Sequence, residues 1–376
     1  MISALIATNG YSVIRLKSSI ANSMKEMRRF LLYGILCGLG LVSCSRYALI
    51  DKVPVEFKRP AKTIYAQSDA TFDLKVPENL YPERLQIVSD SILVIMKQPD
   101  ETSPFFSAYS SRTLQCLGSF LAKGRGPGES LSPNMAAVSA SAPYLYVRDN
   151  SLMLSWEIDV VGSIHVDSVV FARTVPASDP GPVWLPVRDS LFFSYERKGK
   201  DLLYKVWTVS GEEYRSFSPF QGLNLARFFS QMSEIPTGDG DNGKLAFLMV
   251  FFPILHLLDV ESGRWRAIAV DPDWRNWKTL LQEQISMDKM EYYAGATSSA
   301  EYIIALFQKH RIGRTMEAGA RSEIHFFDWS GEFLYRILVE DNLAGLSFDS
   351  INSYLYGIER VAGRILRYDL SSILCI

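Results

Sequence analysis

The stretch of this chain with the most chemical character is Gly124–Glu129, which lies within LGSFLAKGRGPGES. Three glycines at alternate positions, next to a lysine, have the composition of a phosphate-binding loop. A P-loop, however, ends in Gly-Lys-Ser/Thr and opens a helix, whereas the proline here and the following Ser130–Pro133 disfavour a helix. We therefore interpret the motif as a tight connection whose backbone requires glycine. Arg125 and Glu129 are our candidate ligand-binding residues, either paired with each other or bound to a ligand carboxylate or hydroxyl.

The four histidines are not spaced as metal ligands. No His-x-x-x-His or Cys-x-x-Cys pair occurs in the sequence. His256 and His325 occupy the same place in two apolar segments that each end in aspartate. We interpret them as hydrogen-bonded core residues of a repeat. The other two are His165 and His310.

Two further motifs with known chemistry are incomplete. Thr237–Gly243 (TGDGDNG) has acidic residues in a calcium-loop arrangement, but it lacks the third acidic ligand and the distal glutamate of an EF-hand, where Val250 stands. We interpret it as a turn. The Gly-x-Ser-x-Gly elbow of serine hydrolases is absent from the sequence. The sequence thus indicates no catalytic residue, no metal site and no cofactor.

The elements that position these residues repeat along the chain as strand, turn, strand. Ile324–Asp328 is an apolar run, Gly331 supplies a plausible hairpin turn, and Phe333–Val339 resumes as a strand. The same unit occurs at residues 254–270 and 202–217. Short strands separated by turn signals are typical of all-β proteins. A period of roughly 40–60 residues with four strands per unit is typical of a β-propeller.

The strand pattern predicts six blades of four antiparallel strands. Blades one, three and five are predicted at residues 84–121, 183–217 and 292–338. Blade two is predicted at residues 136–171, with Ile164–Phe171 as its outer strand. Blade four, at 245–270, has no clear first strand. Blade six has three strands, within residues 346–368, so we expect a strand within Thr63–Leu74 to complete it and close the ring.

Two segments interrupt the strand pattern. Gln221–Pro236 and Asp273–Met290 carry apolar residues at helical spacing. We predict short amphipathic helices that cover apolar surface, with a role in shaping a binding pocket as the alternative.

The composition fits a folded β protein. The chain has 376 residues, 48% hydrophobic and 12% aromatic, which is enough for a large core. A net charge of −2 gives no case for nucleic-acid binding. Outside the leader, the cysteines are Cys116 and Cys375, which we expect to be buried free thiols rather than a disulfide.

Residues 24–45 read as a secretion signal. Lys25 and two arginines precede an apolar run, Phe30–Val42, that is too short to span a bilayer and has the length of a signal-peptide core. Leu41–Cys44 resembles the bacterial lipobox, in which the cysteine is acylated and becomes the first residue of the mature protein. An ordinary signal peptide is the alternative. Two or more acyl chains would hold the protein stably on a membrane.

These features divide the chain into four segments. Residues 1–23 are interpreted as an upstream extension from a misassigned start, residues 24–43 as the lipoprotein signal peptide, and residues 44–62 as the lipidated cysteine with its tether. The propeller follows at residues 63–376. The residue after Cys44 is Ser45 and not aspartate. By resemblance to lipoproteins of bacteria with two membranes, this predicts the outer membrane. The absence of an acidic cluster after the cysteine favours its periplasmic side.

Taken together, the glycine-rich motif and the C-terminal segment IHFFDWSGEFLYRI…LYGIE…RILRYDL resemble the TolB-like six-bladed propeller lipoproteins of bacteria. The resemblance covers most of residues 63–370. The spacing of Ala122 and Lys123 before the glycines, and the weak fourth blade, depart from the pattern. The resemblance implies the propeller fold and a secreted, lipid-anchored protein, without catalytic residues to carry over.

The leading functional hypothesis is a monomeric, non-enzymatic propeller that binds a ligand, an envelope protein or a glycan through one face. The alternative is a hydrolase or lyase that acts on a sugar or lactone with a central cation. Acidic residues clustered in the channel would favour the enzyme, and an apolar lining would favour binding. A scaffold that organises other envelope proteins is a third hypothesis.

Overall fold

A computed structural model provides the structure. It describes residues 53–72, 82–97, 103–136, 138, 142–176, 185–188, 190–199, 201–220, 223, 225–240, 242–315, 317 and 319–374. The lipidation candidate Cys44 and the signal segment lie outside these ranges. The fold described here belongs to the compact unit Ala48–Ile376.

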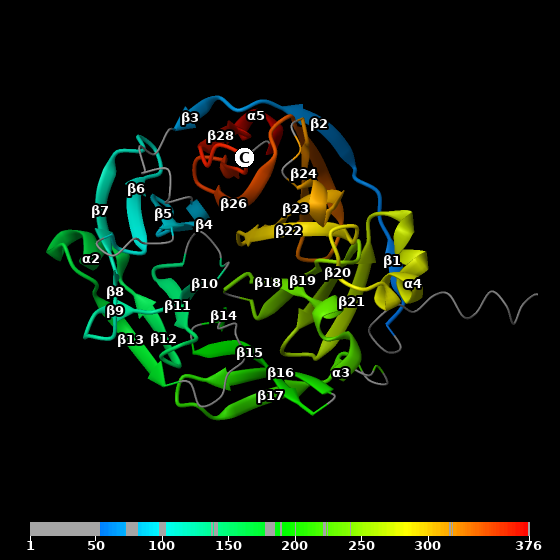
Figure 1. Cartoon of the computed structure of the whole chain (residues 1–376), viewed down its shortest axis with the longest axis horizontal. Helices are drawn as coiled ribbons and strands as arrows, with labels where there is room; N and C mark the ends of the chain where they lie inside the picture. Colours follow the sequence, from blue (N-terminus) through cyan, green and yellow to red (C-terminus); the bar gives the residue numbers. More distant parts are fainter. Residues whose placement is uncertain are drawn as a thin grey trace, which may run out of the picture. The chain divides into compact units, whose positions relative to one another are not determined.

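Six sheets stand around a centre, each with its first strand innermost (Figure 1). Blade one contains β4 (Pro82–Val88), β5 (Ile92–Lys97), β6 (Phe106–Ser110) and β7 (Cys116–Phe120). Blade two contains β10 (Pro133–Met135), β11 (Leu145–Asp149), β12 (Leu154–Ile158) and β13 (Phe171–Pro176). Blade three contains β14 (Leu185–Arg188), β15 (Leu191–Lys198), β16 (Asp201–Thr208) and β17 (Glu213–Phe217).

The second half of the ring repeats this order. Blade four contains β18 (Glu234–Gly238), β19 (Lys244–Met249), β20 (Ile254–Asp259) and β21 (Arg264–Ala269). Blade five contains β22 (Met290–Ser298), β23 (Tyr302–Arg311), β24 (Ser322–Asp328) and β25 (Phe333–Val339). Blade six contains β26 (Leu343–Asp349), β27 (Tyr354–Glu359) and β28 (Ile365–Asp369). The predicted all-β, six-bladed propeller is therefore confirmed.

An N-terminal segment, Val53–Phe72, runs along the rim of three blades, and we call it the strap (Figure 1). Its strands are β1 (Val55–Phe57), which pairs in parallel with β21, and β2 (Lys62–Ala66), which pairs in parallel with β25. Its last strand, β3 (Ala70–Phe72), pairs antiparallel with β28 and supplies the fourth strand of blade six. This confirms the predicted closure of the ring. The strap begins within the segment that we expected to be a tether.

Three ion pairs tie the strap to the blades. Arg266 of β21 donates two hydrogen bonds to Glu56, at 3.0 and 2.7 Å. Lys58 lies 2.6 Å from Glu332, and Arg367 of β28 donates to both carboxylate oxygens of Asp69. All sheet partners of the described strands lie within Ala48–Ile376, so the ring closes without the first 47 residues.

Blade two differs from the prediction. The predicted strand Ile164–Phe171 is mostly a helix, α2 (Val160–Val166), and β13 begins only at Phe171. The helix starts where the Asp159 carboxylate accepts a hydrogen bond from the Gly162 backbone and ends where Asp167 adopts φ 54°. Capping at both ends outweighs the β propensity of its valines. The first strand also lies earlier than the predicted Ala136–Ser139.

The two predicted helical insertions are real but shorter. The first contains α3 (Leu225–Phe228) and the 3₁₀ turn η2 (Ser230–Met232), and its last three residues belong to β18. The second contains η3 (Pro272–Asn276) and α4 (Trp277–Gln282). Trp274 and Leu281 are buried as the helical spacing predicts, whereas Ile285 is exposed beyond the helix end.

The core lies between and within the blades, in four clusters of buried apolar side chains. The largest joins blades three, four and five and is rich in aromatic rings, including Phe193, Tyr204, Phe247 and Trp265. Cys116 is a free thiol but exposed, which corrects the expectation of a buried one, because it lies on the outermost strand of blade one. Cys375 lies outside the described residues. Among those residues, no helix has the length and apolar character needed to span a bilayer.

Candidate functional site

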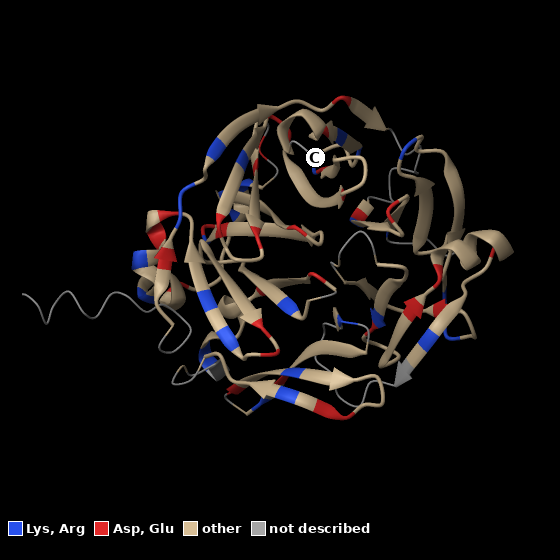
Figure 2. Cartoon of the chain, turned by 180° about the vertical axis from the view of Figure 1, so that it is seen from behind, with Lys and Arg blue, Asp and Glu red and all other residues tan. Residues whose placement is uncertain are grey.

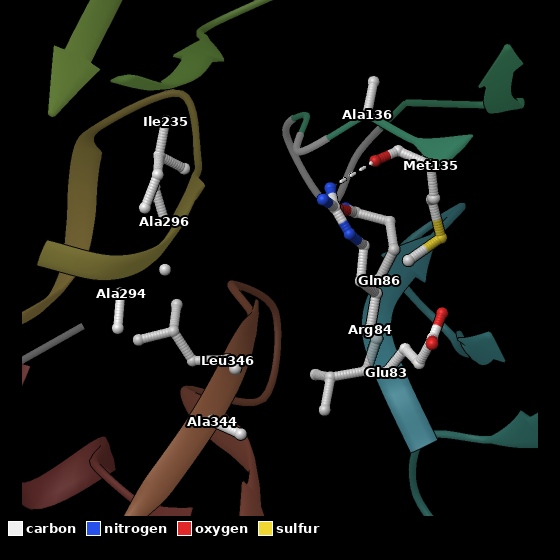
Figure 3. Close-up of a pocket in the computed structure, with 13 residues that line it drawn as sticks. Glu83, Arg84, Gln86, Met135, Ala136, Ile235, Ala294, Ala296, Ala344 and Leu346 are labelled. Atoms are coloured by element: carbon white, nitrogen blue, oxygen red, sulfur yellow. Dashed lines mark hydrogen bonds between the residues drawn. The ribbon is translucent and has the colours of Figure 1, made fainter. Parts of the chain in front are cut away.

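The inner strands of five blades line a cavity of about 230 Å³ in the central channel. Figure 3 shows two facing walls. One wall is small and apolar, with Ala294 and Ala296 of β22, Ala344 and Leu346 of β26, and Ile235 of β18. Two glycines, Gly295 and Gly345, also line the cavity. The lining therefore favours an apolar group of modest size.

The facing wall carries the charge of the site. Arg84 of β4 donates a hydrogen bond from Nη1 to the Met135 carbonyl oxygen at 3.0 Å, and its guanidinium projects beside Gln86 (Figure 3). The Glu83 carboxylate points in a different direction. Burial lowers the pKa of the Arg84 guanidinium, and the Glu83 carboxylate partly offsets this shift. A guanidinium has five N–H donors, so an anionic or carbonyl oxygen in the cavity would find donors on Arg84.

Hydrogen bonds between blades hold this wall in place. The buried Gln86 amide donates to the carbonyl oxygens of Ile87 and Val138, at 2.8 and 2.9 Å. The Ile87 N–H in turn donates to the hydroxyl of Ser347 in blade six, at 2.8 Å. Blade one is thus fixed to both of its neighbours at the strand that carries Arg84.

The channel lining bears on the alternative enzyme hypothesis. Of the thirteen lining residues, Glu83 is the one carboxylate. Within the part of the chain that the structure describes, no three His, Cys, Asp or Glu side chains are placed to hold a metal ion together. The lining residues therefore do not form the acidic cluster that would have favoured a cation-dependent hydrolase or lyase.

The glycine-rich motif is a compact loop on the rim, between β8 (Ala122–Lys123) and β9 (Glu129–Ser130), which pair in parallel. The Glu129 carboxylate turns back into the loop and accepts a hydrogen bond from the Gly126 N–H at 2.6 Å. A Cβ at Gly124 would collide with this carboxylate, and Gly128 adopts φ +79°. The loop is therefore the glycine-requiring connection that the sequence predicts.

Arg125 and Glu129, the candidate ligand residues, do not line the channel cavity. Arg125 is exposed, and no described side chain pairs with it. Glu129 is half-buried, and its carboxylate accepts a hydrogen bond from a backbone N–H of its own loop. Their role in ligand binding stays a prediction, now confined to the rim.

One residue that sequence reasoning missed fastens this loop. The buried Asp149 carboxylate ends β11 and accepts hydrogen bonds from the Ser130 hydroxyl and the Leu131 backbone. Its second oxygen accepts from the Ser151 and Leu152 backbone N–H groups. The available signal is the aspartate that ends a strand before a turn, which also occurs at Asp259, Asp328 and Asp349.

The repeat-position histidines are both in the core. His325 is 2% exposed, and its Nε2 lies 3.2 Å from Glu323. His256 is fully buried, with Nδ1 at 3.8 Å from the Glu234 carboxylate, and neither ring nitrogen has a hydrogen-bond partner. The expectation of a hydrogen-bonded core histidine holds for His325 and is wrong for His256, because the Glu234 carboxylate lies beyond hydrogen-bond distance of its ring.

The sequence analysis did not identify Arg84 and Gln86 as site residues. A single charged or amide residue in one strand does not indicate that its side chain faces a channel. The three polar residues Glu83, Arg84 and Gln86 within the short strand β4 are the one feature that could have marked them.

The blades, their closure and the channel cavity define the class of this protein, which is a six-bladed β-propeller. The sequence model described as "TolB-like 6-blade propeller-like" matches residues 61–202, a segment that includes the glycine-rich loop. The resemblance to TolB-like propellers predicted from its motifs is thus confirmed over this segment. No curated protein matches the chain.

Solved structures are similar to the chain at low sequence identity. A member of the duf4221 family from Bacteroides vulgatus is 11% identical, with a TM-score of 0.54 over 80% of this chain and 96% of that one. Hydrazine synthase of Kuenenia stuttgartiensis is 15% identical, with a TM-score of 0.43 over 80% of each chain. The WD40 repeats of RRP9 are 10% identical, with a TM-score of 0.46 over 81% of this chain and 98% of theirs. At these identities the likeness concerns the fold alone.

Proposed function

We propose that this protein is a bacterial outer-membrane lipoprotein, acylated at Cys44 and facing the periplasm, whose propeller binds a ligand or an envelope partner in its central channel. The lipobox-like Leu41–Cys44 supports the anchor. The channel cavity carries the binding proposal, because one of its walls is apolar and the facing wall holds one guanidinium with donors to spare. Apolar walls with few polar groups are the usual composition of a ligand site.

The size of the cavity limits what it takes. Drug-sized ligands occupy roughly 300–1,000 Å³, and this cavity has about 230 Å³. It would therefore hold a small ligand or one protruding group of a larger partner. An oxygen on that group would pair with Arg84, and its apolar part would contact the alanines of β22 and β26.

The test compares two predicted sites in one experiment. Purified protein captures its ligand or partner from solubilised envelope, and the bound material is quantified. We expect Arg84→Gln and Ala344→Phe to abolish capture, since the first removes the cation and the second fills the cavity. The matched control is Arg125→Gln, an equal charge change on the rim. If Arg125→Gln abolished capture and Arg84→Gln retained it, binding would lie on the glycine-rich loop and the channel proposal would be overturned.

The anchor is tested separately. The mass of the N-terminal peptide shows whether Cys44 carries acyl chains, and Cys44→Ser should release the protein from the membrane fraction. Proteolysis of intact and of permeabilised cells distinguishes the surface from the periplasmic side. A free, unmodified cysteine at position 44 would refute the lipoprotein assignment.

A further inference from the structure

The outer edge of the strap combines exposed aromatic rings with unpaired cations. Phe57 is 37% exposed and Tyr65 is 77% exposed. Arg59 and Lys62 are exposed between them, and no described acidic side chain pairs with either. We call these four residues the strap edge. Lys62 and Tyr65 are three positions apart in β2 and project to opposite sides of this outermost strand, so the strap edge includes both sides of the rim. Figure 2 shows the basic segments of the strap along the rim.

The charge of this stretch has one sign. No Asp or Glu occurs from Phe57 to Ser68. The acidic residues that flank this stretch, Glu56 and Asp69, are paired with arginines of β21 and β28. On blade five and the turn before β25, Glu323 pairs with Arg336 and Glu332 pairs with Lys58. The Lys62 ammonium lies 5.9 Å from the ring centroid of Tyr335, which leaves its charge unneutralised. The strap edge therefore presents net positive charge.

The sequence position of the strap edge brings it close to the proposed anchor. Val53, where the described chain begins, lies nine positions after Cys44, and a chain of that length spans about 30 Å at most. The edge itself is fixed by strand pairing, since β1 is bonded to β21 and β2 to β25. An acyl chain on Cys44 would hold this rim within reach of the headgroups.

We propose that the strap edge is a membrane-contact surface that binds the phosphates of anionic phospholipids, and this rests on the proposed lipid anchor. Aromatic side chains favour the interface between bilayer and water, and cations near an anionic surface are attracted to it. One acyl-anchored cysteine followed by a basic patch is a two-signal arrangement that stabilises membrane binding. The propeller then stands on its rim, and the channel opens sideways along the membrane.

The test uses the chain from Ser45 onward, which contains the whole closed ring but no acyl chain. Its binding is measured by sedimentation with vesicles of phosphatidylcholine alone and with vesicles that also contain phosphatidylglycerol. We expect binding only to the anionic vesicles. The double variant Arg59→Gln/Lys62→Gln should bind on the order of 25-fold more weakly, because each cation near an anionic surface contributes about a factor of five.

Control variants separate this surface from general electrostatics. Arg112→Gln/Lys123→Gln removes the same charge from exposed positions on the β6–β7 turn and on β8 and should leave binding unchanged. Arg59→Lys/Lys62→Arg keeps the charge and should retain it, and Tyr65→Ser should weaken binding although no charge changes. Equal losses in the two Gln double variants would overturn the proposal. Binding of inorganic phosphate without binding of vesicles would also overturn it, since the site would then take free anions.

Failure of the anchor and failure of the strap edge give different results. The vesicle assay contains no acyl chain, so it reports on the strap edge whether or not Cys44 is modified. In acylated full-length protein on anionic vesicles, Lys62 should be protected from amine-reactive reagents, while Lys123 stays reactive. Full reactivity of Lys62 on the anchored protein would refute the orientation and leave the anchor intact.

Discussion

Replacing Asp149 by asparagine tests how the glycine-rich loop is held. Both oxygens of this buried carboxylate accept hydrogen bonds, and all of the donors belong to two adjacent connections. The Oδ2 atom accepts hydrogen bonds from the loop between blades one and two, and the Oδ1 atom accepts hydrogen bonds from the turn after β11. The donors are the Ser130 hydroxyl with the Leu131 and Ser132 N–H groups on one side, and the Ser151 and Leu152 N–H groups on the other.

The cost of Asp149→Asn follows from this count. An asparagine offers one oxygen and one NH₂ group, so one set of donors loses its acceptor. The better orientation turns the NH₂ toward the smaller set, which contains two backbone N–H groups. A hydrogen bond to a charged group contributes about 1.5–3 kcal/mol. The variant should therefore lose about 3–6 kcal/mol of unfolding free energy.

Urea unfolding measures this loss, with Asp259→Asn as the matched control. Asp259 ends β20 in the same way, but its carboxylate holds only its own turn, through the Ser262 N–H at 2.8 Å. We expect that control to cost about 1 kcal/mol. Equal destabilisation by the two variants would refute the argument, since the loop contacts of Asp149 would then contribute nothing.

The pH dependence gives a second readout of Asp149. Burial alone would raise the pKa of its carboxyl, but the hydrogen bonds from Ser130 and the nearby backbone outweigh burial and lower it. A carboxyl with a depressed pKa stabilises the fold above its unfolded value of about 3.9 and loses this contribution as pH falls through the folded value. The difference between wild type and Asp149→Asn should shrink below about pH 4.

Three other variants have defined outcomes. Gly331→Ala should lower the urea midpoint strongly, because Gly331 adopts φ +88° and a Cβ there would collide with Ile268. Hydrogen bonds and charges from its histidine and arginine neighbours outweigh burial and hold the pKa of Glu323 at about 2. Its contribution should therefore persist above about pH 4.3 and vanish toward pH 2, and Glu323→Gln should lack this dependence. His256→Phe removes the ring whose Nδ1 lies 3.8 Å from the Glu234 carboxylate, which keeps the Tyr204 hydroxyl as a donor. Because the two side chains are in contact, a double-mutant cycle with Glu234→Gln should show coupling of about 0.5 kcal/mol or more, whereas additive costs would contradict it.

The strands could be predicted because their signals are local. Apolar runs such as Ile254–Asp259 end in an aspartate that hydrogen-bonds its own turn, and Gly331 takes the positive φ expected of it. Counting strands was enough to predict ring closure, since a three-stranded last blade leaves an open edge. The helix α2 was missed because its capping residues, Asp159 and Asp167, also suit the turns between strands.

The channel site could not be predicted in the same way, because it is assembled from residues far apart in sequence. Arg84, Met135 and Ala344 lie in three blades and meet only once the ring has closed. For Glu129 the sequence predicted a ligand contact, because a carboxylate beside glycines suggests a ligand site. In the structure its nearest donor, the Gly126 N–H, belongs to the loop itself.

The position of each strand within its blade separates the two proposed interactions of this protein. The cavity is lined by the first strands of five blades, and no residue of the strap reaches it. The strap pairs only with β21, β25 and β28, toward the rim. Changes to the lining therefore leave the strap contacts in place, and changes at the strap edge leave the cavity intact. This separation is why ligand capture and vesicle binding can be altered independently in one molecule.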